Sequence, residues 1–240
     1  MDTLFISDLH LDSKRPEVIR YFTNYLKNLS KDISSIYILG DFVEYWVGDD
    51  DPAEGLGELF EQIKIKSKLL DIYFMHGNRD FMISESFCQK LGMTLLPDPS
   101  IISLHGRDII IMHGDTLCID DHKYQDFRKL VRSKSWQNEM LEKPLKERIK
   151  LAEELRQKSL QETESKKEII MDVNDQEVEK TFLKYNVDLM IHGHTHRPNI
   201  HISKFNNKEF KRIVLGDWYN SSFILKYKKN KILIDRASFN

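Results

Sequence analysis

Residues 3–10 read TLFISDLH, a short run of mostly apolar residues that ends in a polar turn carrying Asp8 and His10. Such a run is typical of a buried β-strand. Four further apolar runs end in polar turns marked by glycine, namely ILGD (38–41), MHGNRD (75–80), MHGD (112–115) and IHGHTH (191–196). Because the carboxyl ends of strands in an α/β sheet open onto a shared crevice, these five turns are predicted to form one site.

The rest of the sequence places these turns in an α/β fold. Strands are expected at residues 3–7, 36–39, 71–75, 101–104, 108–112, 188–191, 212–215, 222–227 and 231–235. Apolar residues recur at helical spacing over residues 16–28, 55–69 and 173–184. The first part of the chain therefore has the pattern of βαβ units, and the C-terminal part that of a strand-rich meander. Together they predict an α/β sandwich with helices outside the sheets.

Residues 123–168 differ from the rest of the chain. They carry thirteen Lys and Arg against nine Asp and Glu, a local net charge of +4 in a chain whose net charge is −2. Their apolar residues fall at roughly helical intervals, which predicts two or three amphipathic helices inserted into a core of residues 1–122 and 169–240. From periodicity alone, ordinary solvated helices packed on the core are as well supported as a functional segment.

The composition is that of a folded globular protein. The 240 residues are 40% apolar and 31% charged, and the near-neutral net charge argues against a protein that binds nucleic acid through a large basic surface. The two cysteines, Cys88 and Cys118, form no CxxC motif, which argues against a disulfide framework. Neither a signal peptide nor an apolar run long enough to span a bilayer is visible, so we expect a cytoplasmic protein.

The five turns supply carboxylate, amide and imidazole groups in one predicted site. The candidate metal ligands are Asp8, His10, Asp41, Asn78, His113, His194 and His196. This mixture of oxygen and nitrogen donors suits Mn, Fe or Zn better than Mg or Ca. Seven ligands are too many for one ion and fit two ions that share a carboxylate, an arrangement of many phosphoryl-transfer enzymes. The neighbouring His76, Asp80 and His192 could orient these ligands or could simply fill space.

In order along the chain, DLH (8–10), GD (40–41), GNRD (77–80), His113 and GHTH (193–196) resemble the motifs of the calcineurin-like metallophosphoesterase superfamily. The resemblance implies an α/β fold of the four-layer αββα sandwich type, with a dinuclear metal site. One ion would be held by Asp8, His10, Asp41 and His196. The other would be held by Asp41, Asn78, His113 and His194, with Asp41 bridging the two.

Arg79 departs from the superfamily pattern, in which a histidine usually follows the asparagine. Arginine stays protonated and cannot act as a general acid, but its planar guanidinium can bind phosphate oxygens in pairs. A substrate with a good leaving group is therefore expected, and a nucleoside pyrophosphate qualifies. The candidate catalytic residues are Asp41, Asn78, Arg79 and His113.

Five further stretches narrow the resemblance: GNRDF (77–81), DD (120–121), IMDVN (170–174), HGHTHRP (192–198) and VLGDW (214–218). They resemble the Mn-dependent branch of the superfamily that hydrolyses UDP-2,3-diacylglucosamine in lipid A biosynthesis. The resemblance implies two Mn²⁺ per chain and attack of metal-activated water on the α-phosphorus. The products would be UMP and 2,3-diacylglucosamine 1-phosphate (lipid X). It extends over the helical insertion 123–168, which in that branch caps the site and binds the acyl chains.

The same resemblance implies a set of substrate contacts, at Asn78, Arg79, Asp121, Ser159, Thr163, Lys166 and His194. Thr163 stands where relatives often have asparagine. The basic insertion would also favour an anionic surface, so a monomer bound peripherally to the cytoplasmic face of the inner membrane is expected.

The metal motifs alone leave two other functions open. The first is a phosphodiesterase or nucleotide pyrophosphatase with a different substrate, because all such enzymes share these ligands. The second is a scaffold of the same fold without catalysis, although such proteins usually lose ligand positions and all seven are present here.

Overall fold

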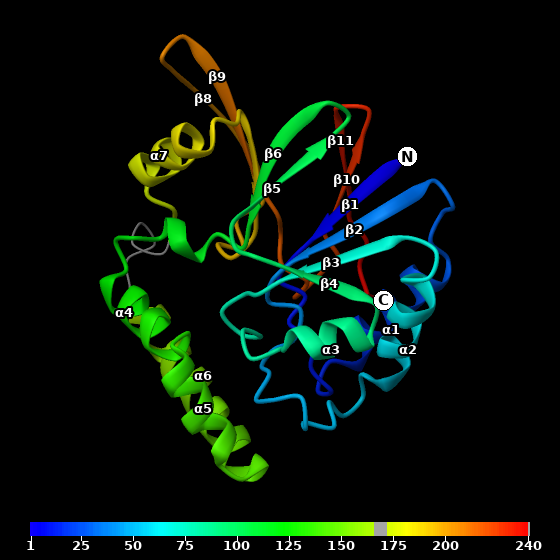
Figure 1. Ribbon diagram of the computed structural model, residues 1–240, viewed down its shortest axis with the longest axis vertical. Coiled ribbons are helices and arrows are strands. Elements are labelled where there is room, and N and C mark those ends of the chain that lie inside the picture. Colours follow the sequence, from blue (N-terminus) through cyan, green and yellow to red (C-terminus); the bar gives the residue numbers. More distant parts are fainter. Residues whose placement is uncertain (166–171, 240) are drawn as a thin grey trace.

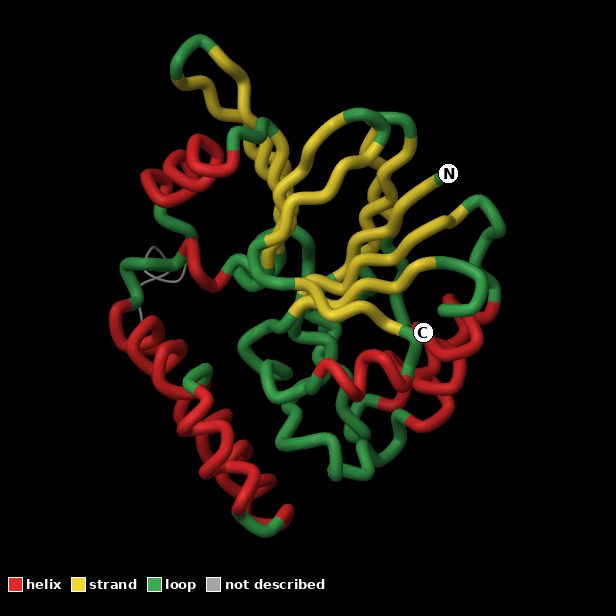
Figure 2. The backbone as a smooth tube through the Cα atoms, viewed as in Figure 1, coloured by secondary structure: helices red, strands yellow, loops and turns green. Residues whose placement is uncertain are grey.

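Two β-sheets form the centre of the molecule (Figures 1 and 2). The computed structural model describes residues 1–165 and 172–239, without the side chains of 160–165. Within this part, the first sheet has the strand order β11-β10-β1-β2-β3-β4 and the second β5-β6-β7-β9-β8. The strands of the first sheet are β1 (Asp2–Ile6), β2 (Ile33–Leu39), β3 (Asp71–Met75), β4 (Met93–Leu96), β10 (Ile224–Lys228) and β11 (Lys231–Asp235). Those of the second are β5 (Ser100–Leu104), β6 (Arg107–Met112), β7 (Leu189–His192), β8 (Asn199–Phe205) and β9 (Lys208–Val214).

Helices cover the outer face of each sheet. Figure 1 shows α1 (Pro16–Lys27), α2 (Gly57–Lys66) and α3 (Glu85–Lys90) beside the first sheet, and α7 (Asp175–Tyr185) beside the second. Helix α1 illustrates why these segments are helical. Proline stands at its start, where the missing N–H costs nothing, and its apolar residues recur at positions 18, 19, 22 and 26 on one buried face.

Three buried apolar clusters separate the layers. One lies between α1–α3 and the first sheet, and a second lies between the sheets, where Phe5 and Leu39 meet Ile109 and Ile111. The intervening Ile110 belongs to the third cluster, with residues of α7, because successive side chains of a strand point to opposite faces. The order is therefore helix, sheet, sheet, helix, which confirms the predicted four-layer αββα sandwich.

Three more helices follow β6 in the chain: α4 (His122–Val131), α5 (Lys134–Glu142) and α6 (Leu145–Ser165). They gather on one side of the two sheets, apart from α1–α3 (Figure 2). Ser133 begins α5 by accepting a hydrogen bond from the backbone N–H of Trp136 at 3.3 Å. In the part of the chain that the structure describes, no helix is long and apolar enough to cross a bilayer.

The strand directions determine where the polar turns lie. Strands β1, β2 and β3 are mutually parallel, and so are β6, β7 and β9. All these strands therefore deliver the turns that follow them to the carboxyl edge of their sheet. Strands β4 and β8 and helix α3 were not expected from the sequence.

Candidate metal centre

The structure brings all seven predicted metal ligands together at the carboxyl edges of the two sheets. Turns after β1, β2 and β3 carry the ligands of the first sheet, and turns after β6 and β7 carry those of the second. In chain order they are Asp8, His10, Asp41, Asn78, His113, His194 and His196.

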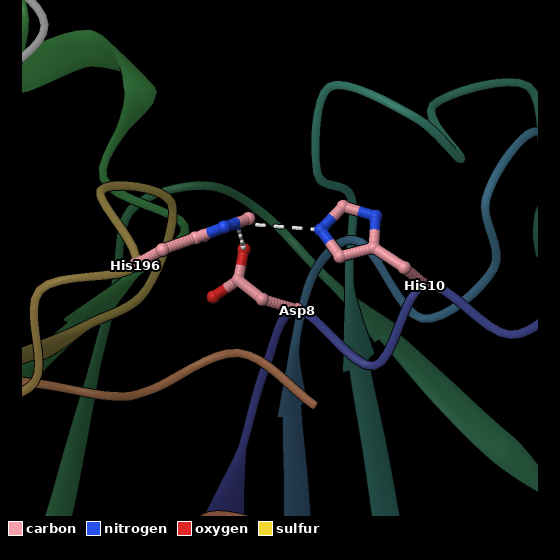
Figure 3. Close-up of side chains that lie close together, drawn as sticks. All are labelled: Asp8, His10 and His196. Atoms are coloured by element: carbon pink, nitrogen blue, oxygen red, sulfur yellow. Dashed lines mark hydrogen bonds and ion pairs between the residues drawn. The ribbon is translucent and has the colours of Figure 1, made fainter. Parts of the chain in front are cut away.

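The first group consists of Asp8, His10 and His196, whose ligand atoms all lie within 4.8 Å of one another. Figure 3 shows Asp8 and His10 from the turn after β1 and His196 from the turn after β7 converging on one another. The Nε2 atom of His196 lies 3.3 Å from Oδ1 of Asp8 and 3.3 Å from Nε2 of His10. Two imidazole nitrogens and a carboxylate oxygen that face one another in this way are the donor set expected around a cation.

A second group forms on the other side of Asp8. Ligand atoms of Asp8, Asp41 and His113 also lie within 4.8 Å of one another. The Oδ1 atom of Asn78 lies 3.0 Å from Nε2 of His113 and 2.9 Å from Nδ1 of His194. The amide oxygen and both imidazoles thus point at a common position.

Asp41 belongs to the second group, also faces the first, and is 2% exposed. Its Oδ2 is 3.8 Å from Nε2 of His10, and its Oδ1 is 3.8 Å from Nε2 of His113. Each carboxylate oxygen therefore faces one group, as a bridging ligand requires.

The backbone at these positions is unusual. Five of the seven ligands have positive φ: Asp8 (55°), His10 (47°), Asp41 (51°), His194 (68°) and His196 (54°). Residues other than glycine rarely adopt this conformation, and such strain concentrates at functional sites. Gly77 allows the turns after β2 and β3 to approach, because a Cβ there would collide with the backbone and side chain of Asp41.

The electrostatics of the site favour a cation. Burial disfavours a charged imidazole at His113, but the carboxylates of Asp41, Asp115 and Asp8 outweigh it and raise its pKa to about 9. Burial also opposes ionisation of Asp8, yet contact with His196 and the charge of His113 hold its pKa well below the ordinary value. The site therefore holds a surplus of negative charge that a divalent ion would neutralise.

Asp80 braces the two turns that carry Asp41 and Asn78. Its carboxylate accepts hydrogen bonds from the backbone N–H groups of Phe42 and Gly77, both at 2.7 Å. Burial and the charge of Asp41 raise its pKa to about 7. This residue thus supports ligand-bearing turns without itself joining either group.

His76 and His192 do not contact the ligand side chains through their ring nitrogens. The Nε2 atom of His76 is 2.7 Å from the carbonyl oxygen of Ile83. His192 lies at hydrogen-bond distance from the carbonyl oxygen of Gly193 and from the guanidinium of Arg212. The sequence left open whether these histidines orient the ligands or simply fill space, and the contacts of both fit the second role.

A cavity of about 450 Å³ adjoins the ligand turns. The sheet side of its wall includes Glu44, Tyr45, Trp46, Val47, Asn78, Arg79, Phe81 and Met82. Helices α4–α6 contribute Lys123, Tyr124, Phe127, Trp136, Met140, Ala152, Leu155, Arg156, Lys158 and Ser159. Asn78 and Arg79 place polar groups in the wall beside the ligand turns. Apolar residues line the cavity from both sides, and the helices add basic groups through Lys123, Arg156 and Lys158.

Of the remaining predicted substrate contacts, some line the cavity and others do not. Arg79 and Ser159 line the cavity. Asp121 is the N-cap of α4, where its carboxylate accepts a hydrogen bond from the backbone N–H of Tyr124 at 3.2 Å. Lys166 and the side chain of Thr163 lie outside the described residues.

Sequence reasoning missed a buried carboxylate behind His113. Asp115 is 0% exposed, and its Oδ2 accepts hydrogen bonds from the Tyr124 hydroxyl at 2.7 Å and from Arg128 Nε at 2.6 Å. The Tyr124 ring lies 5.7 Å from the ring of His194. The spacing of Tyr124 and Arg128, four residues apart on one helix, was the available signal.

Sequence reasoning also missed three residues around His10. The Oε2 atom of Glu44 lies 3.1 Å from Nδ1 of His10, and the ring of Tyr219 stacks on the His10 ring with centroids 5.3 Å apart. Arg156 of α6 forms an ion pair with Glu44. No motif joins these three residues in the sequence.

Two stacked sheets with Asp, Asn and His side chains gathered at the carboxyl edges of both define a metal-dependent phosphoesterase. The family model of the calcineurin-like phosphoesterases matches residues 1–198, and the chain belongs to this family. It is thus a hydrolase with a site for divalent metal.

Curated relatives are similar over nearly the whole chain, and each of the following is named UDP-2,3-diacylglucosamine hydrolase. The protein of Marinobacter nauticus is 44% identical, over 96% of this chain and 95% of its own. That of Stenotrophomonas maltophilia is 41% identical, over 99% of both chains. That of Serratia proteamaculans is 42% identical over the full length of both. A solved archaeal phosphodiesterase is 14% identical, with a TM-score of 0.49 over 99% of each chain.

Proposed function

We propose that the chain hydrolyses UDP-2,3-diacylglucosamine, the substrate in the names of its curated relatives, and that the bond cleaved is the pyrophosphate bond. The observation that carries this proposal is the cavity that joins the ligand turns to the apolar faces of α4–α6. A substrate with a pyrophosphate and two acyl chains needs both kinds of wall. The products are UMP and 2,3-diacylglucosamine 1-phosphate (lipid X), and the reaction belongs to lipid A biosynthesis.

Two Mn²⁺ ions are the proposed cofactors. Asp8, His10, Asp41 and His196 would hold one, and Asp41, Asn78, His113 and His194 the other; the convergence of these donor atoms supports both assignments. When bound, such ions supply the Lewis acidity that activates an attacking water and neutralises charge on the phosphate.

The chain's own residues would position the substrate for attack of water on the α-phosphorus. The bond from this phosphorus to the bridging oxygen breaks, so the oxygen of water ends in UMP. Arg79 would bind phosphate oxygens through its guanidinium, and its buried Nε has no hydrogen-bond partner among the described residues. Asn78 would orient the phosphate through its amide, beside its role as a ligand. As an arginine, residue 79 cannot protonate the leaving group, which suits the low basicity of a phosphate leaving group.

Helices α4–α6, which begin at His122 and include most of the predicted insertion 123–168, would cap the site and bind the acyl chains. Phe127, Trp136, Met140 and Leu155 give the cavity an apolar wall on this side. Lys123, Arg156 and Lys158 line it as well and complement an anionic substrate. Asp121, Ser159, Thr163, Lys166 and His194 are the further proposed substrate contacts.

The basic charge of this segment supports a peripheral association with the cytoplasmic face of the inner membrane. The chain is proposed to act there as a monomer. Washing membranes with high salt tests this point. An electrostatically bound protein should be released by salt, whereas absence from membranes at low salt would contradict the proposal.

The decisive experiment measures UMP release from UDP-2,3-diacylglucosamine in detergent micelles, with Mn²⁺ and then with excess chelator. We expect metal-dependent release, and in ¹⁸O-labelled water the label should appear in UMP and not in lipid X. A small aryl phosphodiester serves as the control substrate. Turnover of the control alone would favour a general phosphodiesterase or another nucleotide pyrophosphatase, and no turnover with no bound metal would favour a scaffold.

A further inference from the structure

We propose that Glu44 is a positioning residue for His10 and that its ion pair with Arg156 couples metal binding to the docking of helix α6. This inference rests on the proposed role of His10 as a metal ligand. It assigns a function to two residues outside the ligand set.

Glu44 approaches the face of His10 that is remote from the metal site. The Nε2 atom of His10 faces His196 and Asp41, whereas Nδ1 lies 3.1 Å from Oε2 of Glu44. This contact departs from ideal hydrogen-bond direction. A carboxylate on the far nitrogen of a ligating histidine fixes its tautomer and ring orientation.

The other oxygen of Glu44 forms an ion pair with Nε of Arg156, which belongs to α6. His10 and Glu44 are 2% and 13% exposed, and the side chain of Arg156 is 22% exposed. The pair is therefore largely shielded from water, where a charge contact is stronger than on an open surface.

Tyr219 provides a second path from Arg156 to His10. Its ring is nearly parallel to that of His10, at 9° and 5.3 Å between centroids. Its hydroxyl lies 3.5 Å from Nη2 of Arg156. Arg156 thus touches both groups that restrain the His10 ring, so a displaced α6 would release His10 from two sides.

Helix α6 is anchored at another point that does not involve the metal ligands. Arg148 donates a hydrogen bond to the carbonyl oxygen of Val47 at 2.6 Å and forms a two-pronged ion pair with Asp50. Loosening this anchor weakens the docking of α6 but leaves the Glu44–His10 contact in place. It therefore serves as a matched control.

Coupling of this kind is reciprocal. If Arg156 supports His10 through Glu44, metal binding must in turn hold α6 more firmly against the sheets. A metal-bound chain should then exchange the backbone amides of residues 145–159 more slowly than a metal-free chain.

The test measures two quantities without substrate, for the full chain and the variants Glu44→Ala, Glu44→Gln, Arg156→Ala and Asp50→Ala. The first is the Mn²⁺ dissociation constant, from competition with a fluorescent chelator. The second is hydrogen–deuterium exchange over residues 145–159 with and without Mn²⁺. Circular dichroism verifies that each variant is folded.

We expect Glu44→Ala to weaken Mn²⁺ binding by about tenfold or more. Arg156→Ala should weaken it less and should abolish the protection of α6 by Mn²⁺. Glu44→Gln keeps an oxygen that can accept from Nδ1 of His10, so it should recover most of the affinity but not the protection. Asp50→Ala should speed exchange in α6 but keeps the Glu44–Arg156 ion pair, so it should weaken Mn²⁺ binding less than Arg156→Ala does.

Unchanged Mn²⁺ affinity in both Glu44→Ala and Arg156→Ala would overturn the proposal. An equal loss in Asp50→Ala and Arg156→Ala would also overturn it, because general loosening of α6 would then explain both. If the chain did not hydrolyse the lipid substrate, these results would still stand, because the measurements contain no substrate. A wild-type chain that binds no Mn²⁺ would overturn the coupling together with the proposed metal site.

Discussion

Each oxygen of the Asp41 carboxylate faces a different histidine. Its Oδ2 lies 3.8 Å from Nε2 of His10, and its Oδ1 lies 3.8 Å from Nε2 of His113. Replacing it with alanine removes a ligand from both groups at once. We expect Asp41→Ala to lose bound metal and to lower turnover by about a thousandfold or more. Metal content after dialysis, from mass spectrometry, and UMP release measure the two effects. A variant that kept two ions per chain would contradict the bridging role.

Arg79 should behave in the opposite way, because it lines the cavity and supplies only its backbone N–H, at 2.8 Å, to the ligand Asp41. We expect Arg79→Ala to keep its metal content and to lose about a hundredfold to a thousandfold in turnover. Arg79→Lys is the matched control. It keeps a positive charge without the planar fork and should recover only part of the rate. Full activity of the alanine variant would exclude a role in phosphate binding.

The ligands were predictable from the sequence because each stands directly after a strand, in a turn that local sequence specifies. Glu44, Asp115 and Arg156 were not, because their contacts arise only when distant elements pack. Arg156 reaches Glu44 across more than a hundred positions of chain. No periodicity within one element can reveal such a pair. The candidate ligands are thus easier to predict than the side chains that pack behind them.

His192 gives the fold a pH dependence of its own. It is 0% exposed and lies at hydrogen-bond distance from the guanidinium of Arg212. Burial and the charge of Arg212 lower its pKa from 6.5 to about 3. At pH values between these two pKa values, His192 is protonated in the unfolded chain but not in the folded chain. The free energy of unfolding therefore decreases as the pH is lowered through this window.

His192 is expected to contribute about 1.4 kcal/mol per pH unit to the change in the free energy of unfolding with pH, the value for one proton. Urea unfolding across the window measures it. His192→Gln cannot titrate, so its stability should fall less steeply with decreasing pH than that of the wild type. Equal slopes would show that His192 is protonated in the folded chain.

At the scale of elements, the buried parallel strands were the most predictable part of the fold. Strand β3 has the expected bounds, 71–75, because its run of apolar residues ends at a clear turn. Strand β8 was missed because it is an edge strand with mostly exposed side chains, in which Ile200 and Ile202 give only a short alternating pattern. Strand β4 has only four residues and helix α3 only six, too few to show a period.

Helix α4 is held to the ligand turns by charges rather than by apolar contacts. Arg128 donates to the buried Asp115 at 2.6 Å, and Arg132 donates to the carbonyl oxygen of Gly77 at 2.8 Å. Removing the buried carboxylate leaves the largely buried Arg128 with Asp98, at 3.7 Å, as its remaining acidic partner. We expect Asp115→Ala to lower the free energy of unfolding by about 3–5 kcal/mol.

Urea unfolding of Asp115→Ala and Asp115→Asn checks this expectation. The asparagine variant keeps an oxygen that can accept from Tyr124 or Arg128, so it should lose less stability than the alanine variant. Equal losses in the two variants would mean that the lost negative charge, which both variants share, is responsible, and that neither the acceptor oxygen kept by asparagine nor the cavity left by alanine matters.

At the scale of the whole molecule, the metal site lies where the two sheets meet. Asp8, His10 and Asp41 come from turns of the first sheet, and His113, His194 and His196 from turns of the second. Ions bound between them would connect both sheets and would bind only the folded chain. Ligand binding of this kind stabilises the folded state by an amount that grows with the free metal concentration.

A free Mn²⁺ concentration one hundred times the dissociation constant should therefore stabilise the chain by about 2.7 kcal/mol. For a chain of this size that raises the melting temperature by roughly 5–10 °C, and excess chelator should reverse the change. Scanning calorimetry at several Mn²⁺ concentrations measures the shift, which should increase with concentration. Asp41→Ala is the control, because it removes the ligand proposed to bridge the two ions and should abolish the shift. A similar shift in Asp41→Ala would place the stabilising ions elsewhere on the surface, and the link between the sheets would then have to be attributed to the buried apolar cluster alone.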